Sequence, residues 1–182
     1  MAYRNGNYAA FYVAEPFDER GLGAYAAHDF CHYQLLRAWA SQDWLFPFND
    51  SHEKTYNVRD GSSWELTLKP RLHERLRNSK NIILFLSSNT KPSKALTEEI
   101  EYGVGTLKLP IIVVYPEFDP IAAGGYFDSR VFELWSALPA FKRLMNTVPT
   151  IHVPMRKDDI SRALSSPGYQ VQSKTKPGLY RL

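Results

Sequence analysis

The chain has 182 residues, of which 44% are hydrophobic and 14% aromatic, and this composition excludes a disordered or collagen-like protein. The length suits one domain with a short appended tail. The net charge is +3, but six of the 22 basic residues and two of the 19 acidic residues lie in residues 155–182, which leaves 16 basic and 17 acidic residues before them. The main part of the chain is therefore nearly neutral, and the basic tail is too short and mixed to favour nucleic-acid binding.

Three features predict a cytoplasmic protein with no membrane partner. The longest apolar runs, residues 82–86 and 111–115, are far shorter than the ~20 residues that cross a bilayer. Residues 1–7 are polar and lack the apolar stretch of a signal peptide. The chain has one cysteine, Cys31, which cannot form an internal disulfide and suits a reducing compartment.

Strand-like and helix-like segments alternate along the chain. The predicted strands are short and apolar, and they cover residues 9–14, 45–48, 81–87, 110–115 and 150–153. The predicted helices have apolar residues at helical spacing, and they cover residues 25–42, 70–78, 92–104 and 128–146. Residues 49–63 are polar and form a predicted long loop, a kind of segment that usually has a function.

This alternation predicts the α/β class, with a parallel sheet of four to five strands and helices on both faces. We expect residues 1–154 to form this domain, and residues 155–182 to form a basic C-terminal helix or tail that packs on it or trails from it. In open parallel sheets, ligands bind beyond the carboxyl ends of the strands. Here those ends lie at residues 14–18, 48–50 and 87–89.

Five residues at these predicted strand ends are candidate substrate-binding residues: Phe17, Asp18, Asn49, Asp50 and Ser88. A phenylalanine can stack on an aromatic ring of a ligand, and the polar residues can bind ribose or phosphate oxygens. The alternative is ordinary turn chemistry, because the sequence Asn-Asp-Ser is common in turns. The sequence alone leaves both interpretations open.

The sequence predicts no metal site. His28 and His32 are four residues apart on a predicted helix, with Cys31 between them, and metal ligands can have that spacing. No further histidine or cysteine follows at a recognisable interval. The glycines at 103, 105, 124 and 125 do not follow a strand in the way that a phosphate-binding loop requires.

Four stretches of the chain carry a resemblance to a known family. They are Phe11-Tyr12-Val13-Ala14; Leu36-Arg37-Ala38-Trp39; Leu68-Lys69-Pro70-Arg71-Leu72, continuing through Arg77-Asn78-Ser79-Lys80 to Asn89-Thr90; and Glu98-Glu99-Ile100, followed by Pro110-Ile111-Ile112-Val113-Val114. Their order and spacing over about residues 9 to 116 resemble the TIR-like proteins of bacterial Thoeris anti-phage defence. The resemblance implies a flavodoxin-like or TIR-like three-layer sandwich.

The resemblance also implies a catalytic residue. In that family, and in NAD-cleaving TIR domains, a glutamate on the helix after the third strand is catalytic, and the Glu-Ile pair makes Glu99 its counterpart. Because Glu98 and Glu101 flank it, the register is open by one residue. Helical geometry puts Glu99 about 100° round from Ile100, on the flank of the apolar stripe. The alternative is a solvated helix face that carries three glutamates.

The function implied by the resemblance is that of an NAD nucleosidase or ADP-ribosyl cyclase, with NAD as substrate and no cofactor. Its ADP-ribose-derived product would be a signalling nucleotide that diffuses to a separate effector protein, and the enzyme would be a homo-oligomer. The alternative is a non-catalytic TIR-like module that acts through assembly. A receiver-like domain that binds a nucleotide or flavin is disfavoured, because the chain lacks a glycine-rich phosphate loop and an acidic cluster at the first strand end.

Overall fold

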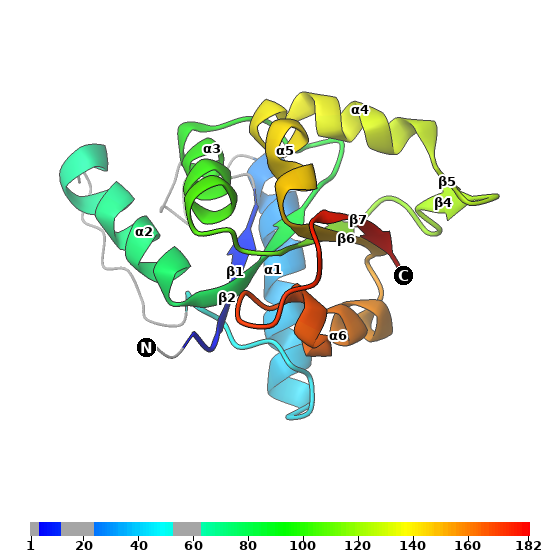
Figure 1. Cartoon of the computed structure of the whole chain (residues 1–182), viewed down its shortest axis with the longest axis horizontal. Helices are drawn as coiled ribbons and strands as arrows, with labels where there is room; N and C mark the ends of the chain where they lie inside the picture. Colours follow the sequence, from blue (N-terminus) through cyan, green and yellow to red (C-terminus); the bar gives the residue numbers. More distant parts are fainter. Residues whose placement is uncertain (1–3, 12–23, 53–62) are drawn as a thin grey trace.

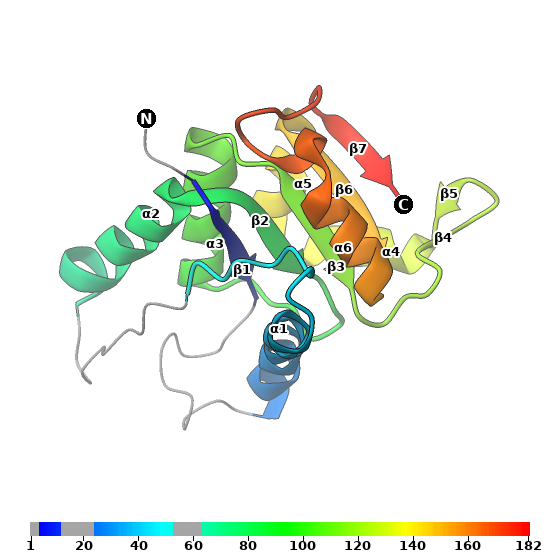
Figure 2. The ribbon, with the colours of Figure 1, turned by 90° about the horizontal axis from the view of Figure 1, so that it is seen from below.

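A five-stranded sheet lies between two layers of helices in the computed structural model, which describes residues 4–11, 24–52 and 63–182, without the side chains of residues 24–29. Figures 1 and 2 show these three layers from two directions. The strand order is β1-β2-β3-β6-β7, and every neighbouring pair is parallel. The predicted α/β sandwich with a parallel sheet is therefore confirmed.

The strands of this sheet are β1 (Gly6–Ala10), β2 (Ser79–Phe85), β3 (Ile111–Tyr115), β6 (Pro149–Pro154) and β7 (Gly178–Arg181). A separate antiparallel hairpin consists of β4 (Ala122–Ala123) and β5 (Tyr126–Phe127). The α-helices are α1 (Ala24–Gln42), α2 (Lys69–Arg77), α3 (Lys94–Ile100), α4 (Ser129–Ala137), α5 (Pro139–Leu144) and α6 (Lys157–Ser165). Short π-helices, η1 (Trp64–Leu68) and η2 (Glu101–Thr106), precede α2 and follow α3, and the 3₁₀-helices are η3 (Met145–Thr147) and η4 (Pro167–Tyr169).

Strand β2 shows why the sheet is covered on both faces. Successive side chains of a strand point to opposite faces, and β2 is apolar on both. Ile82 and Leu84 belong to the core that packs under α2, α3, α4 and α5. Ile83 and Phe85 belong to the core that packs against α1 and α6. A continuous apolar run therefore becomes the centre of a three-layer sandwich.

The prediction of a strand at residues 45–48 is wrong. The backbone N–H groups of Leu45 and Phe46 donate to the side chain and carbonyl of Asp43, and Pro47 has no N–H to contribute to a ladder. Phe46 and Phe48 are buried against α1, so the apolar pattern reflects core packing rather than a strand. The chain reaches the sheet slightly later, where Asp50 forms an isolated parallel bridge with Asn7.

The other boundaries differ by small amounts with identifiable causes. The first strand begins at Gly6 and ends at Ala10, and residues 12–14 of the predicted strand lie outside the described residues. The predicted helix over residues 128–146 is two helices, because Leu138 leaves the helical conformation before Pro139 starts α5. The predicted helix after β2 starts at Lys94, where the Ser93 side chain caps it, and changes to a π-helix at Glu101.

The C-terminal region contributes to the sheet, which the sequence did not predict. After β6, helix α6 buries Ile160 and Leu164 in the same core as α1, and β7 then pairs with β6 in parallel. Strand β7 is partly exposed at alternate residues, so its apolar signal is weak. In the part of the chain that the structure describes, no helix is long and apolar enough to cross a membrane.

Candidate functional site

Glu99 lies on the last turn of α3 and faces the sheet edge that β1 forms. Leu96 and Ile100 are buried against the sheet, which turns Glu99 toward β1 on the flank of the apolar stripe. Tyr8 is on the same face of β1 as the α2 and α3 core, and its hydroxyl donates to Glu99 Oε1 at 2.7 Å. The carboxyl group is thus held by a residue that lies 91 positions earlier in the sequence.

The two neighbouring glutamates have different surroundings. Glu98 forms an ion pair with Lys69 at 3.2 Å and a hydrogen bond with His73 at 2.7 Å, both on α2. Glu101 forms an ion pair with Arg143 on α5 at 2.5 Å. These contacts fasten α3 and η2 to neighbouring helices, whereas Glu99 alone among the three contacts β1 through Tyr8.

Burial controls the protonation of Glu99. It raises the pKa of this carboxyl to about 7, while the hydrogen bond from Tyr8 and the charge of Arg75 act in the opposite direction. The second carboxyl oxygen, Oε2, is buried and has no hydrogen-bond partner among the described residues. A buried carboxyl oxygen without a partner is costly for the fold and is well suited to accept a hydrogen bond from a ligand hydroxyl.

Asp50 lies on the other side of β1 and is held from three directions. Its Oδ2 accepts from the Tyr33 hydroxyl at 2.5 Å and lies 3.8 Å from Arg37 Nε, both on α1. Its Oδ1 accepts from the backbone N–H of His52 at 2.8 Å. Burial opposes ionisation, but the hydrogen bond from Tyr33 and the interactions with the His52 ring and backbone N–H together outweigh it and lower the pKa of Asp50. Asp50 is therefore a fixed, ionised carboxylate.

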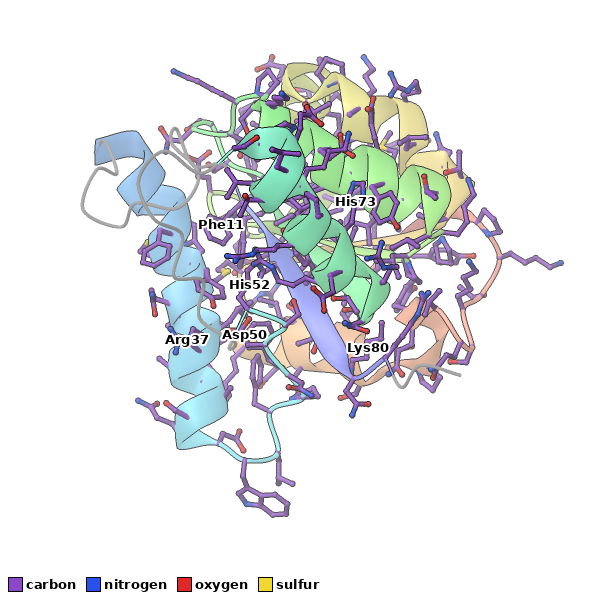
Figure 3. The ribbon with its side chains drawn as sticks, turned by 90° about the vertical axis from the view of Figure 1, so that its left-hand side faces the viewer. Phe11, Arg37, Asp50, His52, His73 and Lys80 are labelled. Atoms are coloured by element: carbon purple, nitrogen blue, oxygen red, sulfur yellow. The ribbon has the colours of Figure 1, made fainter. Side chains whose placement is uncertain are left out.

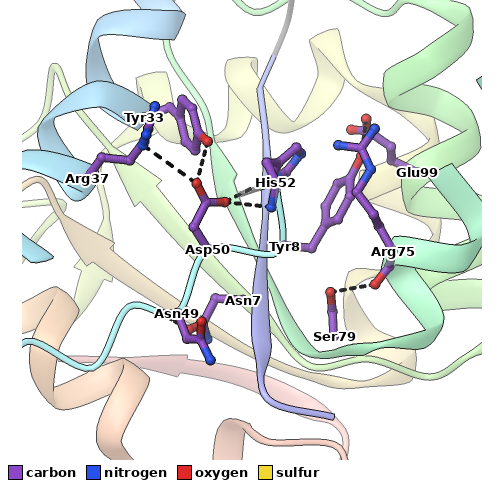
Figure 4. A network of polar contacts seen from close by, with 10 residues as sticks. All are labelled: Asn7, Tyr8, Tyr33, Arg37, Asn49, Asp50, His52, Arg75, Ser79 and Glu99. Carbon is purple, nitrogen blue, oxygen red and sulfur yellow. Dashed lines mark hydrogen bonds and ion pairs between the residues drawn. The ribbon is translucent and has the colours of Figure 1, made fainter. Parts of the chain in front are cut away.

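His52 joins the two halves of the site, as Figure 4 shows. Its ring centroid is 4.7 Å from that of Tyr8 and 5.7 Å from that of Tyr33. Its Nδ1 lies 3.3 Å from Asp50 Oδ1, a contact too poorly aligned to count as a hydrogen bond. Desolvation is the main cause that lowers the pKa of His52. Figure 3 shows Asp50 and His52 beside β1, on the side that faces α1.

We call this group of side chains the polar network. Of the ten residues drawn in Figure 4, we include under this name only Tyr8, Tyr33, Arg37, Asp50, His52, Arg75 and Glu99, and leave out Asn7, Asn49 and Ser79. Arg75 belongs to it because its Cζ lies 5.9 Å from the Tyr8 ring centroid and its charge acts on both Glu99 and His52. The network thus gathers one carboxyl group with a raised pKa, one ionised carboxylate and one histidine at a single edge of the sheet.

The remaining predicted site residues are outside this network or outside the described structure. Asn49 is exposed, and its backbone fastens the segment to β1 through bonds with Asn7 of 2.6 and 2.9 Å. Ser88, after β2, donates from its backbone N–H and its hydroxyl to Glu117, at 2.8 and 2.6 Å. Phe17 and Asp18 lie outside the described residues.

Sequence reasoning missed Tyr8 and His52. Tyr8 precedes the predicted first strand, and its role depends on a contact with a residue 91 positions away. His52 lies in the polar loop beside Asp50, and proximity to a predicted strand end was its one available signal. Within the described residues, no group of three or more histidine, cysteine or acidic side chains could hold a metal ion, and the side chain of His28 is not among those described.

A comparison with protein families assigns the chain. The model of the Thoeris protein ThsB, TIR-like domain, matches residues 8–120, which is more than half of the chain. This range starts at Tyr8 in β1, passes through Asp50 and His52, and includes Glu99, so it contains every residue of the polar network. The chain therefore belongs to the family of TIR-like domains of the Thoeris protein ThsB, and its role is a TIR-like one in anti-phage defence.

Proposed function

We propose that this protein cleaves NAD between nicotinamide and ribose, with Glu99 as the catalytic residue. The observation that carries the proposal is the state of Glu99: a buried carboxyl oxygen without a partner among the described residues, and a pKa raised to about 7. Perturbed carboxyl groups of this kind are enriched at catalytic sites. Membership of a TIR-like family supports the same reaction class.

The chemistry needs one carboxylate. Most glycosidases use two, because an alkoxide leaving group must be protonated. The nicotinamide of NAD is a cationic pyridinium, so it leaves as a neutral molecule with the electrons of the broken C–N bond and needs no proton. A carboxylate that accepts hydrogen bonds from the ribose hydroxyls and offsets the positive charge of the oxocarbenium-like transition state is sufficient.

Substrate binding would also favour the ionised form of Glu99. At neutral pH a carboxyl group with a pKa of about 7 is only partly ionised. The pyridinium of NAD would bring a positive charge to the site, and an opposite charge within several ångströms lowers the pKa of a carboxyl group. The acid would thus become a carboxylate when the substrate that requires it is bound.

The proposed product is an ADP-ribose-derived signalling nucleotide. Once nicotinamide has left, the ribose carbon is captured by whichever nucleophile is held against it. Capture by a group of the same ADP-ribose gives a cyclic product, capture by a bound small molecule gives a conjugate, and capture by water gives linear ADP-ribose. We propose cyclisation first and conjugation second, with a separate effector protein as the receiver and a homo-oligomer as the active form.

A non-catalytic assembly module is the second candidate. The observation that favours it is the exposed pair Trp44 and Leu45 at the end of α1, with 88% and 67% of their surfaces exposed. Large apolar side chains that protrude together can mark an interaction surface. Such a surface can also serve an enzyme that assembles, so the two candidates differ in whether NAD is cleaved.

The deciding experiment is product analysis. Purified protein at high concentration is incubated with NAD, and nicotinamide and all nucleotide products are identified by mass spectrometry. If the protein is an enzyme, we expect one nicotinamide to be released for each NAD consumed. The Glu99→Gln variant should release almost none. Absence of nicotinamide release across protein concentrations at which the protein is shown to assemble would leave the assembly module as the function.

A further inference from the structure

His52 is connected to the proposed catalytic carboxyl group of Glu99 through a single residue, Tyr8. Its ring lies 4.7 Å from the ring of Tyr8, whose hydroxyl donates to Glu99. Histidine can transfer a proton near neutral pH, and Figure 4 shows it between Asp50 and Tyr8. The cleavage step described above needs neither an acid nor a base, so this histidine has no role in that step.

Asp50 is arranged to orient this histidine. Tyr33 and the His52 backbone N–H hold its two oxygens at 2.5 and 2.8 Å, so the carboxylate cannot rotate freely. Oδ1 then lies 3.3 Å from Nδ1 of His52. A carboxylate next to Nδ1 favours the tautomer with its proton on that nitrogen, which leaves the lone pair of Nε2 available to accept a proton. Hydrogen bonds of this kind are often misaligned without substrate and tighten when it binds.

We propose that His52, oriented by Asp50, is the general base for the second half of the reaction, in which the ribose carbon is captured by a protic acceptor. The inference rests on the proposed NAD cleavage. The acceptor atom, in an O–H or N–H group, forms a bond to the ribose carbon with its lone pair. Its bond to hydrogen breaks, and the proton moves to Nε2 of His52. The imidazolium that forms is stabilised by the Asp50 carboxylate.

The charges around His52 fit this role. Burial lowers the pKa of His52, and Arg75 acts in the same direction, so the ring is neutral at pH 7 and ready to accept a proton. Asp50 acts in the opposite direction and stabilises the protonated ring. Arg37 on α1 faces Asp50 rather than the imidazole, and Glu99 is separated from the ring by Tyr8. With His52 as the base, Glu99 has no proton to remove from the acceptor and serves only to stabilise the positive charge of the transition state.

The test compares acceptors that must lose a proton with one that carries none. A substituted pyridine captures the ribose carbon through a ring nitrogen that has no proton, in the reverse of nicotinamide departure. We expect His52→Gln to reduce products from protic acceptors by about 10²-fold or more, the usual contribution of a general base. Exchange of nicotinamide for the pyridine should stay within about threefold of the wild-type rate.

His73→Gln is the matched control, because His73 pairs with Glu98 and stacks on Tyr102 at the junction of α2 with α3 and η2, outside the polar network. It should leave both reactions unchanged. Asp50→Asn is the second variant: its side-chain oxygen can still accept from the His52 N–H, but it removes the charge. Asp50→Asn should also lose products from protic acceptors while keeping pyridine exchange, but by a smaller factor than His52→Gln. If His52→Gln does not fold, the result for Asp50→Asn tests the proposal instead.

The outcomes separate this inference from the proposed function. If wild-type protein neither releases nicotinamide nor exchanges it, NAD cleavage fails and the base role fails with it. If the wild type does both, and His52→Gln or a folded Asp50→Asn loses exchange and capture equally, His52 serves the structure and the base role is overturned. Selective loss of capture with exchange retained supports the role.

Discussion

The hydroxyl of Tyr8 on β1 donates a 2.7 Å hydrogen bond to Oε1 of Glu99 on α3, across 91 residues of sequence. This bond joins the first strand of the sheet to the helix that follows β2, at the edge where Asp50 also meets β1. It engages one oxygen of the carboxyl group and leaves the other, Oε2, without a partner among the described residues. The site therefore orients Glu99 while keeping one oxygen available for a ligand.

The first prediction concerns which glutamate is catalytic. Glu99→Gln keeps the side-chain volume but removes the charge, and we expect nicotinamide release to fall by about 10²-fold or more, as when a charge-stabilising group is lost from an active site. Glu98→Gln and Glu101→Gln should retain activity, because their partners are Lys69, His73 and Arg143 at helix junctions. Initial rates of nicotinamide release from the three variants are compared. Activity lost in Glu98→Gln instead would move the register by one residue.

The second prediction concerns stability and pH. The pKa of Glu99 is raised from 4.5 to about 7 in the folded state. Below pH 4.5 the carboxyl group is protonated in both the folded and the unfolded protein, so it costs no stability. As the pH rises through 7 this advantage is lost, because the buried group must then ionise. Above pH 7 the buried charge destabilises the wild type, by an upper limit of about 3 kcal/mol for a shift of this size. Glu99→Gln should therefore increase the free energy of unfolding at pH 8 and change it little near pH 4.5. Urea denaturation at the two pH values measures the difference; an equal effect at both would contradict the raised pKa.

The third prediction concerns Tyr8. The hydrogen bond from Tyr8 lowers the pKa of Glu99 against the larger effect of burial, so Tyr8→Phe should raise that pKa further. The acidic limb of the kcat/KM profile, which reports ionisation of the free enzyme, should move to higher pH. Activity well above neutral pH should recover toward the wild-type value. A uniform loss at every pH would instead indicate a direct role of the hydroxyl in substrate binding.

The sequence was sufficient for the layers of the fold and for the orientation of Glu99. Continuous apolar runs in β2 and β3 mark strands covered on both faces, and the spacing of Leu96 and Ile100 leaves Glu99 on the flank of α3. Asp50 was predicted as a site residue because it follows the apolar segment at residues 45–48, which was expected to be a strand. That strand does not form: Phe46 and Phe48 are buried against α1 and do not pair with another strand. Burial and pairing leave the same pattern in a short apolar segment.

The partners within the site could not be predicted in the same way. Tyr8 lies just before the predicted first strand, and its hydroxyl acquires a role only through its hydrogen bond to Glu99 on α3 in the folded chain. His52 lies in a polar segment that has no periodicity to read. Strand β7 alternates exposed and partly buried residues, and its place depends on the edge that β6 leaves open. These features depend on contacts between elements rather than on local pattern.

The fourth prediction concerns assembly. We expect specific activity to rise with protein concentration, because a freely active NADase would deplete the cell and the proposed active form is a homo-oligomer. Trp44 and Leu45 protrude at the end of α1. Replacing both with serine should leave the unfolding free energy nearly unchanged, as for most exposed positions, while shifting the rise to higher concentration. Light scattering and nicotinamide release are measured over the same dilution series. Constant specific activity in a demonstrably monomeric sample would refute the dependence on assembly.

The last prediction concerns the acceptor of the ADP-ribose. Proximity of a held nucleophile is worth many kcal/mol, so a group bound beside the ribose carbon outcompetes bulk water when water is excluded from the site. Glu99 and His52 are both partly buried, and desolvation is the largest cause of the shift in the pKa of each, which indicates a site with restricted access for water. We therefore expect the main product to contain no oxygen from solvent.

The measurement is a reaction with NAD in ¹⁸O-labelled water, followed by separation of the products and mass spectrometry. A cyclic product or a conjugate without the label would support a signalling nucleotide. Linear ADP-ribose carrying the label as the sole product would identify water as the acceptor, and the proposed messenger would then have to be abandoned while NAD cleavage by Glu99 remained.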